Sequence, residues 1–300
     1  MREGIMLCYP WSAQRLTTYN KPYIVQAKLN GERCRVLMTP DGVKLLSSEG
    51  NEFNLLPKIQ ENPFWTALAE YYGGEAEFDG ELYCHGISRQ EIHSIVSRRV
   101  NIHPEVDLIY ISLFDTPQLE AEQATRTQTL TEAFNRALYS VGCTEYIKLV
   151  STYCAISLGD IEQYLRHCLN LGYEGVVVKN PSSYYTRARS TNWMKIKPRK
   201  FDRYTIVGYT EECDIYGNPK GSLGAFDVCD KDGKTFKVGT GFTACQRATW
   251  WEDRTNMLGM DILVYYPTLT NRGIPDNPVF KCLYEKGMPS KGYEEIEEML

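Results

Sequence analysis

The hydrophobic pattern of this 300-residue chain changes character at about Pro198. Before this point, short strand patterns are interspersed with stretches whose apolar residues recur at helical spacing, and these stretches predict helices over 63–72, 88–97, 117–141 and 158–171. After it, only short strand patterns remain, separated by Gly-rich turns, which is typical of a small barrel. The sequence therefore predicts an α+β chain with a first domain over residues 1–200 and an all-β domain over 201–300.

Cysteine usage and charge narrow the possible functions. The ten cysteines are scattered singly without a Cys-x-x-Cys pair, which argues against a zinc finger or a disulfide framework and favours reduced thiols. No apolar run approaches the roughly 20 residues of a membrane span, and the first residues do not open a secretory signal. We therefore expect a cytoplasmic protein (in the host cytoplasm, if viral) with no membrane partner. The net charge of −5 gives no global sign of nucleic-acid binding.

The most informative local segment is Lys28-Leu29-Asn30-Gly31-Glu32-Arg33, which directly follows a strand-like run over 23–27. A lysine amine at a strand end suits attack on the α-phosphate of a nucleotide. Gly31 would allow a tight turn beside the phosphates, and Arg33 could reach phosphate or ribose oxygens. An Asn-Gly pair between two apolar runs is also a strong β-hairpin signal. This segment alone leaves both interpretations open.

Four further clusters of charged or aromatic residues lie at or within predicted strands. They are Asp79-Gly80-Glu81, Leu113-Phe114-Asp115, the run 174–179 and the run 193–197. In the last run, strand alternation places Lys195 and Lys197 on one face, where two ammonium groups repel each other unless an anion lies between them. Each cluster by itself is more often a solvated strand edge than a site. Together with Lys28, however, they supply the residue types that bind a triphosphate and its metal.

In order and spacing these clusters resemble the motifs of the covalent nucleotidyltransferase superfamily, and most closely those of ATP-dependent DNA ligases of the small viral or phage form. The resemblance runs from about Ile5 to the end of the second domain. It implies an adenylation (nucleotidyltransferase) domain of antiparallel sheets with flanking helices, followed by an OB-fold barrel. It also implies that ATP donates AMP to a lysine with the help of Mg²⁺ (or Mn²⁺). The AMP then moves to the 5′-phosphate of a nick, and the 3′-hydroxyl closes the strand.

The resemblance also implies roles for individual residues. Lys28 corresponds to the lysine that becomes adenylated, and Lys195 and Lys197 correspond to the paired lysines on the α-phosphate. The remaining nucleotide and metal contacts that it implies are Gln26 at the adenine edge, Arg33 at the ribose, Glu81 near the ribose and the metal, Phe114 stacked on adenine, and Glu174 at the metal.

Asn30 departs from the family pattern, which usually has an aspartate at this position. In the family that aspartate is tied to the metal and to the 3′-hydroxyl during sealing. An amide keeps the shape of the side chain but loses its charge. We therefore expect Asn30 to belong to the catalytic set and the final sealing step to be the one that differs.

A basic stretch between residues 179 and 203 predicts the contact with nicked duplex DNA. It contains eight basic residues and one acidic residue, and it joins the two domains. Such a patch would neutralise phosphates and make binding sensitive to salt, although a solvated charged surface has the same composition. The chain is expected to act as a monomeric, nick-clamping enzyme. The residues predicted to contact DNA are Lys179, Arg187, Arg189, Arg199, Lys200 and Arg203.

Three other functions share part of this pattern. An RNA ligase has the same nucleotide-binding motifs, and Asn30 gives it some support, whereas Arg33 and the barrel segments favour DNA. An mRNA-capping guanylyltransferase shares the lysine chemistry but takes GTP. A non-catalytic nucleic-acid-binding protein could retain a degenerate pocket, although the complete set of charged residues around Lys28 argues against it.

Overall fold

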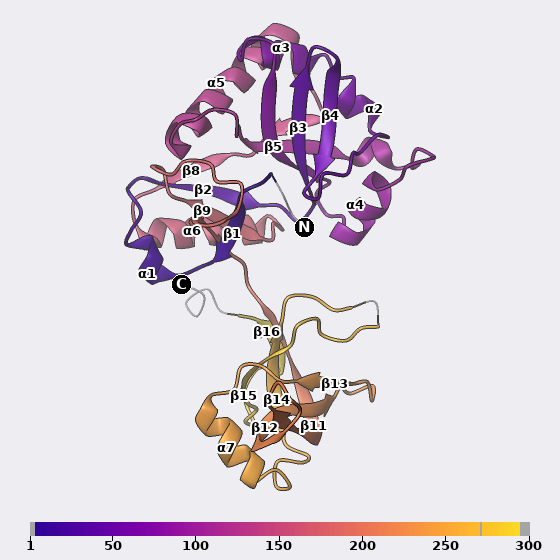
Figure 1. Ribbon diagram of the computed structural model, residues 1–300, viewed down its shortest axis with the longest axis vertical. Coiled ribbons are helices and arrows are strands. Elements are labelled where there is room, and N and C mark those ends of the chain that lie inside the picture. Colours follow the sequence, from indigo (N-terminus) through magenta and orange to yellow (C-terminus); the bar gives the residue numbers. More distant parts are fainter. Residues whose placement is uncertain (1–3, 271, 295–300) are drawn as a thin grey trace. The chain divides into compact units, whose positions relative to one another are not determined.

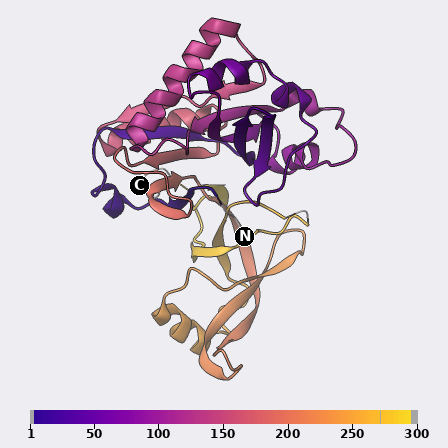
Figure 2. The ribbon, with the colours of Figure 1, turned by 45° about the horizontal axis from the view of Figure 1, so that its top comes forward.

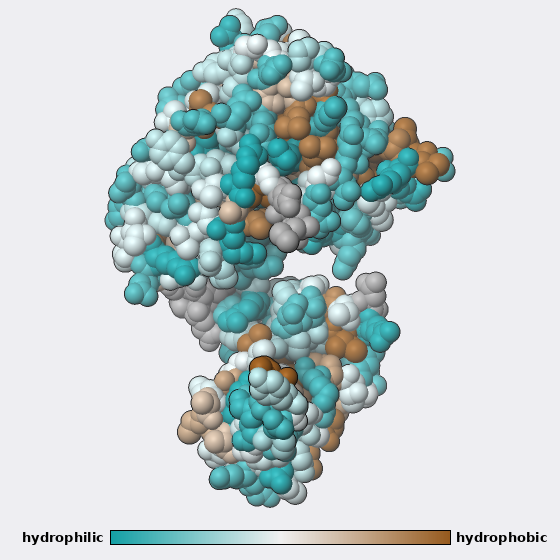
Figure 3. All heavy atoms as spheres, viewed as in Figure 1, coloured by the Kyte–Doolittle hydropathy of each residue, from teal (hydrophilic) through white to brown (hydrophobic). Residues whose placement is uncertain are grey.

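The computed structural model describes residues 4–270 and 272–294 and divides the chain into two compact units (Figures 1 and 2). The first unit ends at Lys197 and the second begins at Pro198. The first unit combines two β-sheets with helices, and the second is built mainly of strands. The α+β class that the sequence predicts is therefore confirmed. On the face seen in Figure 3, hydrophilic side chains cover most of each unit, with a few hydrophobic patches between them.

The first sheet carries the segment that holds Lys28. Its strands pair antiparallel except for β1 and β10, which run parallel. The register aligns Lys28 with Gly175, and Lys195 with Val177, so the ends of three neighbouring strands meet. In spatial order the strands are β1 (Leu7–Pro10), β10 (Arg189–Ile196), β9 (Gly175–Lys179), β2 (Tyr23–Lys28) and β8 (Thr152–Ala155).

The second sheet of this unit positions Arg33 opposite Glu81 on paired strands. It is antiparallel except for the pair formed by β6 and β7. The resemblance implied antiparallel sheets, and each sheet departs from this by one parallel pair at its edge. In spatial order the strands are β4 (Gly42–Ser47), β3 (Glu32–Thr39), β5 (Ala76–Tyr83), β6 (Tyr110–Asp115) and β7 (Ile147–Leu149).

Helices cover both sheets of the first unit. Helix α5 packs on α3 and β6, and Figure 2 shows it along the outer side of the unit, while α6 packs on the first sheet. The sequence predicts that α5 starts at residue 117, but it starts at Gln123, because 117–122 form a loop and the first helical amides donate to carbonyls of Pro181 and Ser183. The helices are α1 (Ala13–Leu16), α2 (Pro57–Gln60), α3 (Phe64–Glu70), α4 (Arg89–Val96), the short 3₁₀ helix Val106–Leu108, α5 (Gln123–Val141) and α6 (Leu158–Asn170).

The Asn-Gly turn after Lys28 does not close a hairpin. Strands β2 and β3 belong to different sheets, so the chain crosses from one sheet to the other at residues 29–31. Gly31 is required there, because a Cβ on this residue would lie 2.1 Å from the carbonyl oxygen of Leu82. The hairpin interpretation of this segment is therefore wrong, and the turn instead joins the two halves of the first unit.

The second unit is a sheet in the order β13-β12-β11-β14-β15, with β16 paired to β11. The sequence pattern does not reveal α7, whose N-terminus carries a capping box between Thr243 and Gln246. Trp250 and Trp251 of α7 pack against the core of the sheet. The elements are β11 (Lys200–Cys213), β12 (Pro219–Cys229), β13 (Thr235–Val238), α7 (Ala244–Glu252), β14 (Asp261–Tyr266), β15 (Val279–Leu283) and β16 (Lys291–Tyr293).

Among the helices of the described residues, none combines the length and the apolar character that a membrane crossing requires.

Candidate active site

Glu174 links two lysines at the ends of neighbouring strands of the first sheet. Lys28 is the last residue of β2, Glu174 directly precedes β9, and Lys197 directly follows β10. The Lys28 Nζ lies 2.5 Å from Glu174 Oε2, and the Lys197 Nζ lies 2.6 Å from Glu174 Oε1. The Glu174 amide also donates to the Lys28 carbonyl at 3.1 Å. Strand β9 lies between β2 and β10, which brings these three side chains together.

Charge pairing in this cluster determines the protonation of Lys28. Burial lowers the pKa of Lys28, but the negative charges of Glu174 and Glu81 outweigh this, and the pKa lies above its usual value. Without a bound nucleotide, Lys28 is therefore an ammonium paired with a carboxylate.

The pKa values of Lys195 and Glu174 both lie below their usual values. The pKa of Lys195 is lowered by burial and by the positive charges of Lys197 and Lys28. Burial raises the pKa of Glu174, but Lys28 and Lys197 outweigh burial and hold it below its usual value. The buried side chains of Met194 and Ile196 confirm that Lys195 and Lys197 share the opposite face of the strand. An anion between these lysines would relieve their mutual repulsion.

Glu81 completes the charged lining from the second sheet. It stands opposite Arg33, and its Oε1 accepts a hydrogen bond from the Gly31 amide at 3.0 Å. Burial raises the pKa of this carboxyl, against the opposing effect of Lys28 and Arg33. Glu81 therefore fixes the turn that follows the lysine and adds a second carboxyl group near it.

The donor set fits a magnesium ion that arrives with a nucleotide better than a resident metal. The described residues contain no cluster of three or more Asp, Glu, His or Cys side chains that could hold a metal ion. Mg²⁺, however, commonly binds through one or two carboxylates together with substrate phosphates. Glu81 and Glu174 supply two such carboxylates beside Lys28, as the electrostatic coupling of all three groups indicates.

Arg33 lies where the sequence placed it, but its side chain is committed mainly to the protein. Its Nε donates to Asp79 Oδ1 at 2.5 Å, and a terminal nitrogen contacts the other Asp79 oxygen and the Met6 carbonyl. Asp79 is fully buried and also accepts a hydrogen bond from the Tyr185 hydroxyl at 2.5 Å. The expected contact of Arg33 with nucleotide oxygens therefore competes with a buried ion pair. Asp79 is the residue that the sequence interpretation missed, although it belongs to the same strand motif as Glu81.

Phe114 forms a supported aromatic platform on β6. The Arg33 guanidinium lies 4.6 Å from its ring centroid, and Trp193 meets it edge-on at 6.3 Å. Gln26, on β2, is 4% exposed and donates to the Thr152 hydroxyl at 3.0 Å. Phe114 is only half-buried, so part of its ring remains available for stacking.

Lys179 is a correction to the predicted DNA-binding set. Its side chain is buried, with 1% of the residue exposed, and its Nζ donates to the Phe114 carbonyl at 3.0 Å. The same nitrogen lies 4.1 Å from the Trp193 ring centroid and 3.9 Å from Asp115. Burial lowers its pKa to about 8 against the opposing charge of Asp115. Lys179 cannot reach DNA phosphates and instead supports the Phe114 platform.

The other predicted DNA contacts are largely engaged inside their own units. In the first unit, Arg187 pairs with Glu77 at 2.6 Å and Arg189 donates to the Cys8 carbonyl at 2.8 Å. The three in the second unit contact neighbours of that unit: Arg199 with Glu294 at 2.5 Å, Arg203 with Asp261 at 3.7 Å, and Lys200 with the Tyr293 ring at 5.9 Å.

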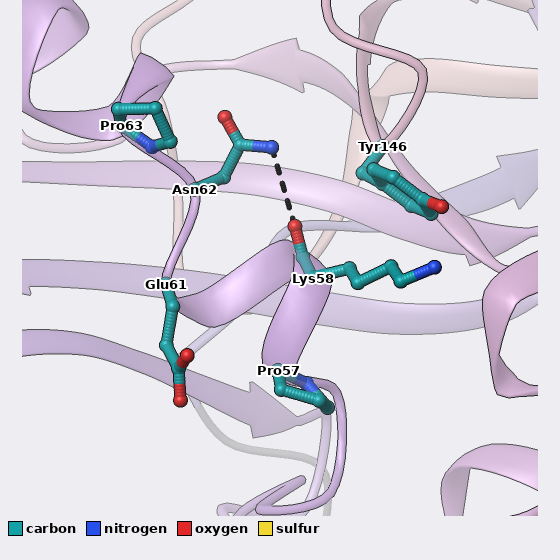
Figure 4. A pocket seen from close by; sticks show the side chains of 6 residues that line it. All are labelled: Pro57, Lys58, Glu61, Asn62, Pro63 and Tyr146. Atoms are coloured by element: carbon teal, nitrogen blue, oxygen red, sulfur yellow. Dashed lines mark hydrogen bonds between the residues drawn. The ribbon is translucent and has the colours of Figure 1, made fainter.

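Asn30 is exposed in the turn between the two sheets, next to the nucleophile candidate. A separate open pocket of about 310 Å³ lies beside α2 (Figure 4). Lys58 and Tyr146 point toward it, and Asn62 donates to the Lys58 carbonyl at 3.2 Å. None of the predicted site residues lines this pocket, so it is not the nucleotide site.

Comparison with known families matches each part of the chain to a domain family. Residues 6–197 match the family described as ATP dependent DNA ligase domain, and residues 216–283 match the DNA ligase OB-like domain. A DNA ligase of Haemophilus influenzae is 27% identical over 197 residues, which is 66% of this chain and 68% of the relative. DNA ligase 2 of Methanosarcina mazei is 28% identical over 249 residues, which is 74% of this chain but only 41% of the relative.

Solved structures share the fold. A Lig E DNA ligase aligns with a TM-score of 0.64 at 20% identity and covers 95% of this chain and 100% of its own. The ATP-dependent DNA ligase of bacteriophage T7, in complex with ATP, aligns with a TM-score of 0.56 at 15% identity over 94% of this chain and 98% of its own. The first family match alone spans more than half of the sequence. The chain therefore belongs to the ATP-dependent DNA ligases, enzymes that seal nicked DNA.

Proposed function

We propose that Lys28 is the nucleophile and that sealing proceeds through a lysyl-AMP intermediate. The observation that carries this proposal is the position of Lys28 Nζ, 2.5 Å from Glu174, which also holds Lys197 at 2.6 Å. The amine attacks the α-phosphorus of ATP, a nitrogen–phosphorus bond forms, and pyrophosphate leaves with the bonding electrons. A 5′-phosphate oxygen of the nick then displaces Lys28 from AMP. Finally the 3′-hydroxyl displaces AMP and closes the phosphodiester.

Lys28 must lose its proton before it attacks. Its raised pKa means that the resting amine is an ammonium paired with Glu174. Lys195 and Lys197 share one strand face beside it, and we assign them to the α-phosphate, where their charges offset the charge of the phosphate oxygens. Mg²⁺ (or Mn²⁺), held by Glu81 and Glu174 together with phosphate oxygens, would neutralise charge on the triphosphate.

We assign the adenine to Phe114 and Gln26. Phe114 presents a half-buried ring that Arg33 and Trp193 support, and Gln26 lies on β2 two residues before Lys28. Arg33 then mainly supports the Phe114 ring. Only the partly exposed edge of its guanidinium is available to contact the ribose. The nucleotide would contact residues of both sheets of the first unit.

The partner that we propose is nicked duplex DNA, bound by a monomer in the cytoplasm (of the host, if viral). We propose that residues 1–200 form the adenylation domain and that residues 201–300 form the OB-fold domain. The second candidate is an RNA ligase, which Asn30 favours because the usual aspartate of the DNA-sealing family is missing.

The deciding experiment is incubation with radiolabelled ATP or GTP and magnesium, followed by a chase with nicked DNA or nicked RNA duplex. We expect label from ATP on the wild type, none on Lys28→Ala, and a sealed DNA strand after the chase. Lys44→Ala, at an exposed position of β4, is the matched control and should label normally. Label on Lys28→Ala would overturn the nucleophile assignment.

Other outcomes separate the alternatives. Transfer to RNA alone would make the chain an RNA ligase, and label from GTP would indicate a capping-type transferase. If neither nucleotide labels the wild type, the chain binds nucleic acid without catalysis.

A further inference from the structure

The segment that follows α4 carries two adjacent arginines that have no partner. Arg98 and Arg99 are exposed, and no described residue forms an ion pair or hydrogen bond with either of them. The predicted DNA-contacting arginines, in contrast, each pair with a carboxylate or donate to a carbonyl, for example Arg187 with Glu77. In a chain with a net charge of −5, two neighbouring unpaired guanidinium groups form a local positive site.

The same segment exposes apolar side chains. Val100 is 86% exposed and Ile102 is 51% exposed. The segment projects from the first unit beyond α4 in Figure 1, and Figure 3 shows hydrophobic and hydrophilic atoms side by side on this projection. Exposed apolar residues next to unpaired cations indicate a contact surface rather than a merely solvated loop.

Helix α4 fixes this segment relative to the proposed nucleophile. The helix begins with a capping box between Ser88 and Glu91, and its first residue, Arg89, donates from Nε to the Gly31 carbonyl at 3.2 Å. Arg89 also pairs with Glu32 at 3.1 Å. The N-terminal end of α4 is therefore bound to the turn that directly follows Lys28.

The length of α4 sets the distance from that turn to the arginines. Eight helical residues span about 12 Å at a rise of 1.5 Å each. One strand of B-DNA rises about 3.4 Å per nucleotide, so this length corresponds to roughly three to four nucleotides. Phosphates at that distance from the reacting position belong to the same duplex that the active site engages.

We propose that residues 97–103, here called the α4 loop, dock the duplex on one side of the nick. Arg98 and Arg99 contact backbone phosphates, and Val100 and Ile102 pack against the sugars at the groove edge. Charge complementarity selects DNA as the occupant, because a duplex carries one negative charge per about 1.7 Å of its axis. The inference rests on the proposed function and adds a DNA contact in the first unit that the basic run 179–203 does not provide.

The test measures binding of the full-length chain to a fluorescent nicked duplex by anisotropy over a series of salt concentrations. Arg98→Ala/Arg99→Ala should weaken binding roughly tenfold and reduce the slope of log affinity against log salt by about 1.8, the value for two lost phosphate contacts. Val100→Ser/Ile102→Ser should weaken binding while leaving the salt slope unchanged. Arg136→Ala, at an exposed position of α5 with no hydrogen bond or ion pair to a described residue, is the matched control and should bind like the wild type.

Labelling by ATP without DNA separates this proposal from the proposed function. All four proteins should label equally, which also shows that the variants are folded. Unchanged affinity and salt slope in the double arginine variant would overturn the α4 loop proposal and leave this surface to a protein partner. A wild type that takes no label would instead overturn the proposed function, whatever the loop does.

Discussion

The side chain of Glu174 sets the protonation state of Lys28, the proposed nucleophile. Each of its oxygens holds one lysine, so a single carboxylate keeps Lys28 protonated and Lys197 in place. A nucleoside triphosphate brings negative charge to the same two lysines and competes with Glu174 for them. The resting pair therefore keeps Lys28 protonated before a nucleotide binds.

Asn30 gives the first prediction at the scale of a residue. Asn30→Asp should leave the labelling of Lys28 unchanged, because Asn30 lies in the exposed turn beyond the Lys28–Glu174 pair. Restoring the carboxylate should maintain or speed the closure of a nick that already carries AMP, measured as sealed strand per unit time. A slower closure step in Asn30→Asp would contradict the role that we give to this position.

Lys179 gives a prediction for stability against pH. An unfolded lysine keeps its proton to about pH 10.4, whereas Lys179 in the folded protein loses it at about pH 8. Between these values the unfolded chain binds more protons, so this residue stabilises the fold increasingly as pH rises, and the contribution is lost as pH falls through 8. The wild type should gain roughly 2 kcal/mol relative to Lys179→Met between pH 7 and 9.5.

Urea unfolding at the two pH values measures this difference. Lys44→Met, at an exposed position, serves as the control. Its free energy of unfolding should change with pH as that of the wild type does. If the stability of the wild type relative to Lys179→Met does not rise with pH, the lowered pKa of Lys179 is contradicted.

At the scale of elements, close contacts between strands hold the site together. Gly175 begins β9, with φ at +152°, and a Cβ there would lie 2.1 Å from the Ile196 carbonyl oxygen. That carbonyl belongs to β10, between Lys195 and Lys197. The spacing of β9 and β10 therefore depends on the missing side chain.

Gly175→Ala should separate these strands and weaken both folding and catalysis. Overpacking of this kind costs roughly 1–3 kcal/mol, and we expect a lower thermal midpoint together with reduced labelling by ATP. Gly159→Ala, in α6, meets only the Ser157 hydroxyl at 3.8 Å and is the matched control. Equal stability and labelling of the two variants would contradict the contact.

The sequence predicted most elements but not which strands pair. Apolar periodicity gave the helices from α3 to α6 and the lysine face of β10, because these patterns are local. Asn-Gly is also a local signal, yet β2 and β3 enter different sheets, which only long-range pairing decides. For the same reason the sequence marked Arg33 and Lys179 as cationic residues but could not show their partners. Arg33 pairs with Asp79, and Lys179 donates to the Phe114 carbonyl.

At the scale of the whole molecule, binding to DNA has to overcome a net charge of −5. Clusters of cationic side chains must therefore provide the attraction to the DNA phosphates, and salt screens this attraction. Raising salt from about 50 to 200 mM should weaken binding of nicked duplex at least roughly tenfold, while labelling by ATP in the absence of DNA should change little. Binding that is insensitive to salt would mean that apolar contacts, rather than phosphate contacts, dominate.

The proposed position of the nucleotide between the two sheets would have a mechanical consequence. Lys28 and Glu174 lie at the first sheet, whereas Phe114 and Glu81 belong to the second, and residues 29–31 lead directly from one to the other. An AMP that is bonded to Lys28 through its phosphorus and stacked on Phe114 through its adenine would bridge the two sheets, covalently at one end and by aromatic stacking at the other. In a single-molecule stretching experiment, we expect the first unit of the adenylated protein to unfold at a higher force than that of the unmodified protein.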